Sequence, residues 1–243
     1  RLELALRDAW RFRLERGEAA IRFEIDAWHF AAQARNAAAT TEVRALVAQL
    51  GGAVLHESLI GDIAYHGFLI EVPAAGVRQL LAGDAAPLLR SDRVMFFRAQ
   101  GQAVEPLNTA EERAAAPPPA TQRTAGTPVV ALLDGLPLAN HPLLQGRVSV
   151  DDPDGWANSY PAAERMHGTA MASLVALGDL GTQELPLARP IYARPIMQPT
   201  GTNGRREERT PDDRLLIDLI HMAVRRMFEP EAGRPAAAPD VRA

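Results

Sequence analysis

The feature that most constrains the fold is an apolar run that ends in a carboxylate. Residues 129–135 read Val-Val-Ala-Leu-Leu-Asp-Gly. An unbroken apolar run of this length is typical of a parallel strand that is covered on both faces. Asp134 then lies at the carboxyl end of that strand, where functional side chains collect in open α/β sheets. The run predicts a parallel sheet and makes Asp134 a candidate site residue, although Asp-Gly after a strand is also a common turn.

A second stretch, residues 167–173, reads His-Gly-Thr-Ala-Met-Ala-Ser. It predicts a helix that begins at His167 and is ended by Gly178 and Gly181, because glycine commonly follows a helix end. The large apolar side chains expected to be buried are Met171, Leu174, Val175 and Leu177. A lone histidine before a helix is usually structural. However, a carboxylate and an imidazole that extend from neighbouring elements, as Asp134 and His167 would, are two of the three members of a serine-hydrolase triad.

Composition narrows the chemistry that these residues can perform. The chain has no cysteine, which excludes disulfides, a thiol nucleophile and zinc–thiolate sites. It has no lysine, so all 26 basic residues are arginine, and a P-loop lysine or a Ser-Lys dyad is excluded. The net charge of −4 argues against a nucleic-acid partner, and no apolar run reaches the roughly 20 residues of a membrane span. The chain begins with Arg1 without a signal peptide, so we expect an excerpt or processed product of undetermined localisation.

The first hundred residues alternate between strand and helix patterns. Four segments have the pattern of strands: residues 21–27, 53–59, 65–72 and 94–98. Two helices are predicted, one starting at Thr40 and one at Pro73. The resulting order, β-α-β-β-α-β, predicts a ferredoxin-like domain. Three histidines in this region lack the spacing of a metal site: His29, His56 and His66.

The chain divides into four parts, and the fold class is α/β. Residues 1–20 are rich in Arg and Glu and are expected to form a solvated helix or lead-in segment. Residues 21–103 form the ferredoxin-like N-terminal domain. Residues 104–126 are a Pro/Ala-rich linker, because consecutive prolines with few large apolar side chains favour an extended spacer. Residues 127–243 are expected to form an incomplete parallel-sheet α/β domain.

The rest of this second domain is expected to contain a polar loop, an acidic turn and one more helix. Residues 198–209 are polar and predict a loop. Residues 151–154 resemble half of a calcium loop but lack its first ligand, so they predict an acidic turn, with metal binding as an alternative. Thr210 and Pro211 are a strong helix start, and Glu229-Pro230 a stop. The buried stripe of that helix is predicted to comprise Leu215, Leu216, Leu219, Ile220, Ala223 and Met227.

Together with the His141-Pro-Leu-Leu segment between them, the two motifs resemble the first part of the subtilisin-like serine proteases (subtilases), over about residues 127–180. In that family the triad runs Asp, His, Ser along the chain. The resemblance implies that Asp134 orients the imidazole of His167 and favours its charged form. His167 then acts first as general base and afterwards as general acid. It implies a subtilisin-like fold for the second domain, a protein or peptide substrate, and no cofactor apart from structural calcium as an option. It also implies that the ferredoxin-like domain is propeptide-like and packs on the protease domain.

The nucleophile of such a triad is not found in these residues. Residues 168–172 resemble the family's nucleophile block with alanine in place of serine, but they directly follow His167 and lie too early. The five serines lack the nucleophile context: Ser58, Ser91, Ser149, Ser159 and Ser173. We therefore expect the serine and the oxyanion-hole asparagine beyond residue 243. Two alternatives stay open: a non-catalytic binding or regulatory module on a degenerate subtilase scaffold, and a metal-dependent hydrolase that uses Asp134, His167 and the acids of 151–154.

Overall fold

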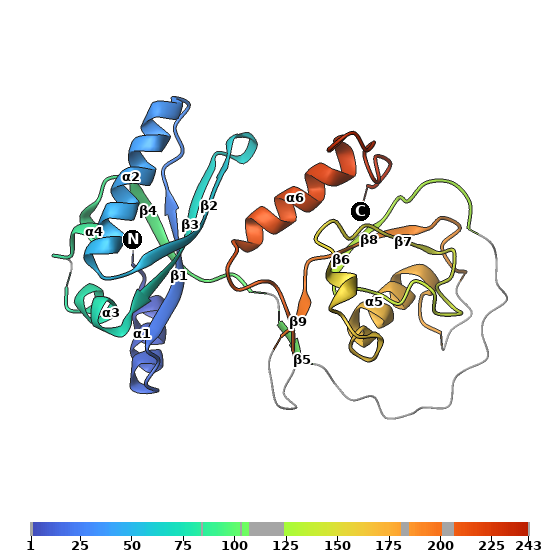
Figure 1. The fold of residues 1–243 in the computed structure, drawn as a ribbon, viewed down its shortest axis with the longest axis horizontal. Helices are drawn as coiled ribbons and strands as arrows, with labels where there is room; N and C mark the ends of the chain where they lie inside the picture. The colour runs from blue at the N-terminus through green and yellow to red at the C-terminus, as the bar shows by residue number, and fades with distance from the viewer. Residues whose placement is uncertain are drawn as a thin grey trace. The chain divides into compact units, whose positions relative to one another are not determined.

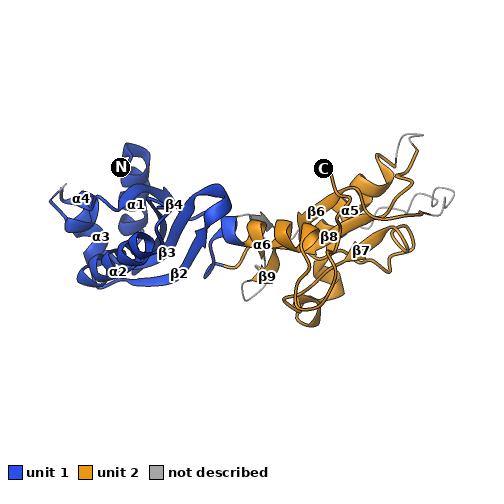
Figure 2. Ribbon diagram, turned by 90° about the horizontal axis from the view of Figure 1, so that it is seen from above, with its two compact units in different colours: residues 1–101, 212–218 blue, residues 102–211, 219–243 orange. Residues whose placement is uncertain are grey.

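The chain forms two compact units, each with α-helices and β-strands (Figures 1 and 2). A computed structural model describes residues 2–83, 85–102, 104–106, 124–180, 185–200 and 207–242. The first unit comprises residues 1–101 and 212–218, and the second comprises residues 102–211 and 219–243. The predicted linker residues 107–123 lie outside the described part of the chain. Among the described helices, none has the length and apolar character needed to cross a bilayer.

The first unit is built on a four-stranded antiparallel sheet with the order β2-β3-β1-β4. Its strands are β1 (Ala20–Ala27), β2 (Ala53–Ile60), β3 (Tyr65–Pro73) and β4 (Val94–Ala99). Its helices are α1 (Leu4–Glu15), α2 (Gln33–Gln49), α3 (Ala74–Leu81), the short α4 (Pro87–Arg90) and the 3₁₀ turn η1 (Gly61–Ile63). The predicted β-α-β-β-α-β order is present, with α4 added before the last strand.

Helix α1 occupies the segment expected to be a solvated helix or lead-in, but it is not fully solvated, because two of its side chains are buried in the core. Trp10 is only 1% exposed and Leu6 is also buried. The centroid of the Trp10 ring lies 4.4 Å from the centroid of the Phe23 ring on β1. Because large aromatic side chains dominate the packing of a small core, α1 is a structural part of the first unit.

Helix α2 begins at Gln33, earlier than the start at Thr40 that the sequence predicted. Both threonine hydroxyls that could have capped a helix make other contacts within the structure. Thr40 Oγ1 donates to Glu57 on β2 at 2.5 Å, and Thr41 Oγ1 donates to the carbonyl of Ala37 at 3.0 Å. The alanine-rich residues before Thr40 have high helix propensity, which favours the earlier start.

Residues 212–218 cover part of the sheet on the face opposite α2. Successive side chains of a strand point to opposite faces. On β2, Glu57 contacts α2, so Ser58 points the other way, where its hydroxyl donates to Asp218 at 2.6 Å. Leu215 is fully buried in this segment, and Asp212 forms an ion pair of 2.7 Å with Arg22.

Two carboxylates of β1 are buried on this covered face. Asp26 pairs in the sheet with Gly67, which in turn pairs with Ser58, and Glu24 accepts a hydrogen bond of 2.7 Å from the backbone N–H of Gly101. Burial raises the pKa of Glu24 above its usual value. Burial also raises the pKa of Asp26, despite its 2.7 Å ion pair with Arg98.

We expect Glu24→Gln to stabilise the first unit at neutral pH, because the amide oxygen keeps the Gly101 hydrogen bond without a buried charge. A raised pKa means that the folded state binds more protons than the unfolded state above the ordinary glutamate pKa of about 4.3. Stability due to this group is therefore lost as the pH rises through the raised pKa. Thermal unfolding at pH 4 and pH 7 should show the stability gain of Glu24→Gln growing with pH. Glu15→Gln, at an exposed position, is the control, and a gain that does not depend on pH would contradict the explanation.

The second unit contains the predicted parallel sheet, in the order β6-β8-β7. Its strands are β6 (Ala131–Asp134), β7 (Val148–Val150) and β8 (Ile191–Pro195). Helix α5 (Met166–Leu177) packs on the sheet through Ala172, Ala176 and Leu177, whereas Leu174, predicted to be buried, is 55% exposed. Two 3₁₀ turns, η2 (Trp156–Asn158) and η3 (Ala162–Glu164), precede α5.

A small antiparallel sheet, β5-β10-β9, replaces part of the predicted linker and polar loop. Its strands are β5 (Val104–Pro106), β9 (Gln198–Thr200) and β10 (Glu207–Arg209). Strand β5 pairs with β10 across about a hundred residues of sequence, whereas β9 and β10 are close together along the chain. None of the three carries a hydrophobic alternation, so the sequence pattern did not predict them.

Helix α6 (Leu216–Phe228) begins six residues after its predicted cap, Thr210. Thr210 is 1% exposed, and Asp212 is engaged by Arg22, so tertiary contacts hold this segment outside the helix. The helix ends before Glu229-Pro230 as predicted. Most of its predicted stripe is buried, but Ile220 is 39% exposed. After it, the backbone N–H of Arg242 donates to the carbonyl of Val129 at 2.9 Å, which places the end of the described chain beside the residues that lead into β6.

Candidate active site

Asp134 is the last residue of β6, at the carboxyl end of the parallel sheet. Its side chain is buried, and the backbone N–H of Gly135 donates to its Oδ1 at 2.7 Å. Its own carbonyl accepts the N–H of Ile196, just after β8, at 2.8 Å. Both the main chain and the carboxylate of Asp134 are thus held in place by the sheet and by the turn that follows.

His167 is the second residue of α5 and faces this carboxylate. Its Nε2 lies 3.2 Å from Asp134 Oδ1. The His167 side chain keeps 28% of its surface exposed, while that of Asp134 keeps 10%. The structure therefore brings together the two residues that the sequence singled out. It buries the carboxylate and leaves the imidazole accessible to another molecule or chain segment.

The two residues after His167 make this approach possible. A methyl group at Gly168 would overlap the carbonyl oxygen of Gly135 and would lie 2.7 Å from its carbonyl carbon, so only glycine allows the helix start to contact the turn. Thr169 Oγ1 donates to the Arg165 carbonyl at 2.5 Å and accepts the N–H of Leu138 at 2.9 Å. Through these bonds the helix start is tied to the loop that follows Asp134.

We expect Gly168→Ala to destabilise the second unit by about 2 kcal/mol and to separate His167 from Asp134. Alanine gains about 1 kcal/mol of helix propensity over glycine. Overpacking commonly costs about 1–3 kcal/mol, and the upper end applies because the obstacle is backbone. The overlap therefore outweighs the propensity gain, and a fall in the unfolding midpoint of the second unit by about 4–8 °C is expected.

The control for Gly168→Ala is the reverse change on the exposed side of the same helix. Ala170→Gly should lose only the propensity difference of about 1 kcal/mol, without moving the helix. If Gly168→Ala raised the unfolding midpoint instead, the close contact with Gly135 would not be what requires glycine at this position.

The orientation of the His167 ring determines which of its nitrogens can act as a base. A neutral imidazole donates from one ring nitrogen and accepts at the other. Since Nε2 faces Asp134, the carboxylate favours the tautomer that carries its proton there, and Nδ1 is left as the basic nitrogen. In the standard triad Nδ1 faces the aspartate and Nε2 is the base, so the two ring nitrogens of His167 have exchanged these roles here. In either arrangement the pair can act as an oriented base.

The five serines hold positions elsewhere in the two units. Ser58 Oγ donates to Asp218, Ser91 Oγ to Glu42, and Ser159 Oγ to the Trp156 carbonyl. Ser149 lies within β7, and Ser173 lies on α5 six residues after His167. None of these places is the strand-to-helix context in which a triad serine is expected.

The acidic stretch 151–154 makes contacts that do not assemble a metal site. Both oxygens of Asp152 accept backbone N–H groups, from Trp156 at 3.0 Å and from Ala157 at 2.8 Å. Asp151 accepts the Tyr192 hydroxyl at 2.9 Å, and burial together with this carboxylate raises the pKa of Tyr192. Among the described residues, no group of three or more His, Asp or Glu side chains is placed to hold a metal ion.

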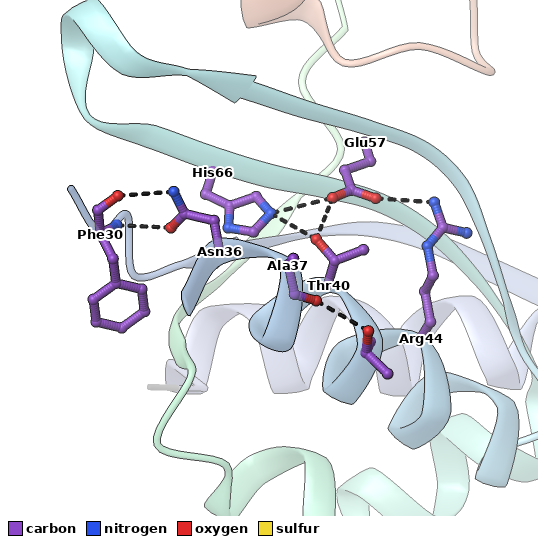
Figure 3. A network of polar contacts seen from close by, with 8 residues as sticks. Phe30, Asn36, Ala37, Thr40, Arg44, Glu57 and His66 are labelled. Atoms are coloured by element: carbon purple, nitrogen blue, oxygen red, sulfur yellow. Dashed lines mark hydrogen bonds and ion pairs between the residues drawn. The ribbon is translucent and has the colours of Figure 1, made fainter. Parts of the chain in front are cut away.

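A second histidine–carboxylate pair lies in the first unit (Figure 3). His66 Nε2 lies 3.3 Å from both Glu57 Oε1 and Thr40 Oγ1, and Arg44 donates to Glu57 at 2.9 Å. Burial raises the pKa of Glu57, but hydrogen bonds from Thr40, Arg44 and His66 outweigh it and hold the pKa below its usual value. Because the His66 side chain is fully buried, this network joins α2 to the sheet and offers no imidazole to a substrate.

Glu208 is a further residue near the pair, and sequence reasoning missed it. It is fully buried on β10, and its carboxylate lies against Gly135. His141, by contrast, was singled out by the sequence, but it serves a turn in which its Nδ1 accepts the Leu143 N–H at 3.3 Å. Comparisons with protein-family models and with curated proteins gave no match for this chain.

Proposed function

We propose that this chain carries the aspartate and histidine of a subtilisin-like serine endopeptidase, within a subtilisin-like parallel-sheet domain. The observation that supports this most is the 3.2 Å contact between His167 Nε2 and Asp134 Oδ1, which joins the start of a helix to the carboxyl end of a parallel strand. The order along the chain and the glycine after each residue agree with the resemblance of the two motifs to the family.

In this proposal the two side chains have distinct roles. His167 takes the proton of a serine hydroxyl as that oxygen attacks a peptide carbonyl, and it returns the proton to the leaving amine. Asp134 holds the imidazole in one orientation and stabilises the imidazolium that forms. A protein or peptide is the substrate, and the reaction needs no cofactor.

The proposed nucleophile lies beyond residue 243, in a block of the type Gly-Thr-Ser-x-Ala. The C-terminal residues 240–242 already lie beside the start of β6. Because β6 is an edge strand of the parallel sheet, a strand continuing from there would extend the sheet beside β6. The positions of the five serines within residues 1–243 also agree with the alternative of a non-catalytic module, and the experiment below separates the two.

The test is to treat the complete product of the gene with a fluorophosphonate probe and to locate the labelled residue by mass spectrometry. We expect one labelled serine downstream of residue 243 and a parallel loss of casein hydrolysis. A complete product without labelling or hydrolysis supports the binding module. Hydrolysis that survives the probe but is lost to a chelator supports a metal-dependent hydrolase.

We further propose that residues 21–103 form a ferredoxin-like domain that assists folding of the protease domain and inhibits its active site. The sheet order β2-β3-β1-β4 and the covering of one sheet face by residues 212–218 support this role. A shortened protein without residues 1–126 should refold slowly or cleave without restraint. A shortened protein that refolds and cleaves like the complete one would rule out this role.

A further inference from the structure

Gly135, the residue after Asp134, is enclosed on two sides. On one side its carbonyl group contacts Gly168 at the start of α5. On the other side a methyl group added to Gly135 would overlap Glu208 Oε1 and would lie 2.8 Å from the hydroxyl of Tyr160. The backbone of Gly135 is not among those with positive φ, so space and not conformation excludes a side chain here.

Glu208 reaches this position through the small antiparallel sheet. It is the central residue of β10, which is hydrogen-bonded to β5 on one side and to β9 on the other. Its side chain has no solvent exposure, whereas the neighbouring Glu207 is exposed. Tyr160 is 2% exposed, and its hydroxyl has no hydrogen-bond partner within the described residues.

We propose that Glu208 is a positioning residue for the Asp134–His167 pair, acting through Gly135. Its carboxylate lies against Gly135, whose carbonyl group contacts Gly168 of α5, so that Gly135 is held between Glu208 and Gly168. The distance between Asp134 and His167 is then set by this clamp, because Asp134 Oδ1 is bonded to the Gly135 N–H and His167 adjoins Gly168. This inference rests on the proposed function in that it assigns a role at the same site.

The chemistry of the position supports a specific role for Glu208. Burying a carboxylate is unfavourable unless other contacts compensate, and apolar replacements of similar volume are commonly neutral or stabilising. The fully buried carboxylate of Glu208 lies against the residue that follows Asp134, which is the placement that a positioning role requires. The side chain touches Gly135 and not the reacting atoms, which makes it a positioning residue.

The experiment measures the imidazole ¹⁵N signals of His167 in the 243-residue chain labelled with ¹⁵N-histidine. The chain has six histidines, so His167→Gln assigns the signal. Asp134→Ala defines the position that the signals take without the carboxylate. We expect Glu208→Ala to move the His167 signals at least half of the way to that position, and Glu208→Gln, which keeps the shape, to leave them near the wild type. Glu207→Ala, on the same strand but exposed, should change nothing.

A double substitution tests the clamp directly and covers the case in which Glu208→Ala does not fold. Gly135→Ala alone should displace the His167 signals, because its methyl group overlaps Glu208. In Gly135→Ala/Glu208→Ala the overlap with Glu208 is removed, and only the 2.8 Å contact with the Tyr160 hydroxyl remains, so at least half of the displacement should be reversed. A folded Glu208→Ala protein with wild-type His167 signals would overturn the proposal, as would a double variant that is unfolded or keeps displaced signals. Hydrolysis is not measured, so failure of the proposed protease function would leave this outcome readable.

Discussion

Replacement of His167 by alanine is expected to lower kcat for peptide hydrolysis by the complete gene product by a factor on the order of 10⁶. In the proposed mechanism, the imidazole is the group that takes the proton from the nucleophile and returns it to the leaving amine. Without it, an unassisted serine hydroxyl retains only the benefit of substrate binding and oxyanion stabilisation. The measurement is kcat on a chromogenic peptide, after circular dichroism has shown that the variant is folded.

His221→Ala is the matched control for this experiment. His221 is a partly exposed histidine on α6 of the same unit, and the contacts described above give it no place at the Asp134–His167 pair. Its replacement should leave kcat within about twofold, since surface substitutions are usually close to neutral. Activity of His167→Ala within about tenfold of the wild type would remove the imidazole from the mechanism, because general acid–base catalysis alone contributes about 10²–10⁴-fold.

The elements that the sequence predicted well are those whose signal is local. The alternation in β1 and the apolar run before Asp134 predicted strands that are present, because the side-chain period of a strand is a local signal. Burial follows these patterns less closely, since Glu24 and Asp26 of β1 are buried too and residues 131–133 of β6 are only partly buried. Thr210 shows the limit of such signals. Its cap motif is strong, but the residue is buried, Asp212 pairs with Arg22, and α6 begins only at Leu216. Contacts made far along the chain decided that boundary.

The residues of the candidate site also differ in whether local sequence signals or distant contacts determine their positions. Asp134 lies at the end of a strand and His167 at the start of a helix, and both elements have a clear sequence pattern. The proximity of the two residues could therefore be predicted from the two motifs and their order along the chain. Glu208 lies within a polar stretch without periodicity, and it reaches Gly135 only because β10 pairs with β5 and β9. The hydrophobic pattern of residues 198–209 contains no signal for that pairing. The glycines at positions 135 and 168 were the only sequence feature related to this contact. A residue without a side chain allows another group to lie close to the backbone, as Glu208 does at Gly135 and the Gly135 carbonyl does at Gly168.

Asp134→Ala is expected to lower kcat by a factor on the order of 10⁴, less than the loss in His167→Ala. In the proposed mechanism, the carboxylate does not take part in proton transfer to or from the substrate. Its removal leaves the base present but free to rotate and without a negative charge beside the imidazolium. A loss in Asp134→Ala as large as that in His167→Ala would instead indicate that the carboxylate is itself a reacting group.

Asp134→Asn separates the two contributions of the carboxylate, because of how Oδ1 is bonded. The Gly135 N–H donates to Oδ1 at 2.7 Å, and the same oxygen faces His167 Nε2 at 3.2 Å. That amide N–H needs an acceptor, so the carbonyl oxygen of an asparagine should take the place of Oδ1 and still accept from the imidazole. Orientation is then kept while the charge is removed, and we expect a kcat between those of the wild type and Asp134→Ala. A kcat for Asp134→Asn as low as for Asp134→Ala would show that the negative charge, and not the orientation, is what this buried aspartate contributes.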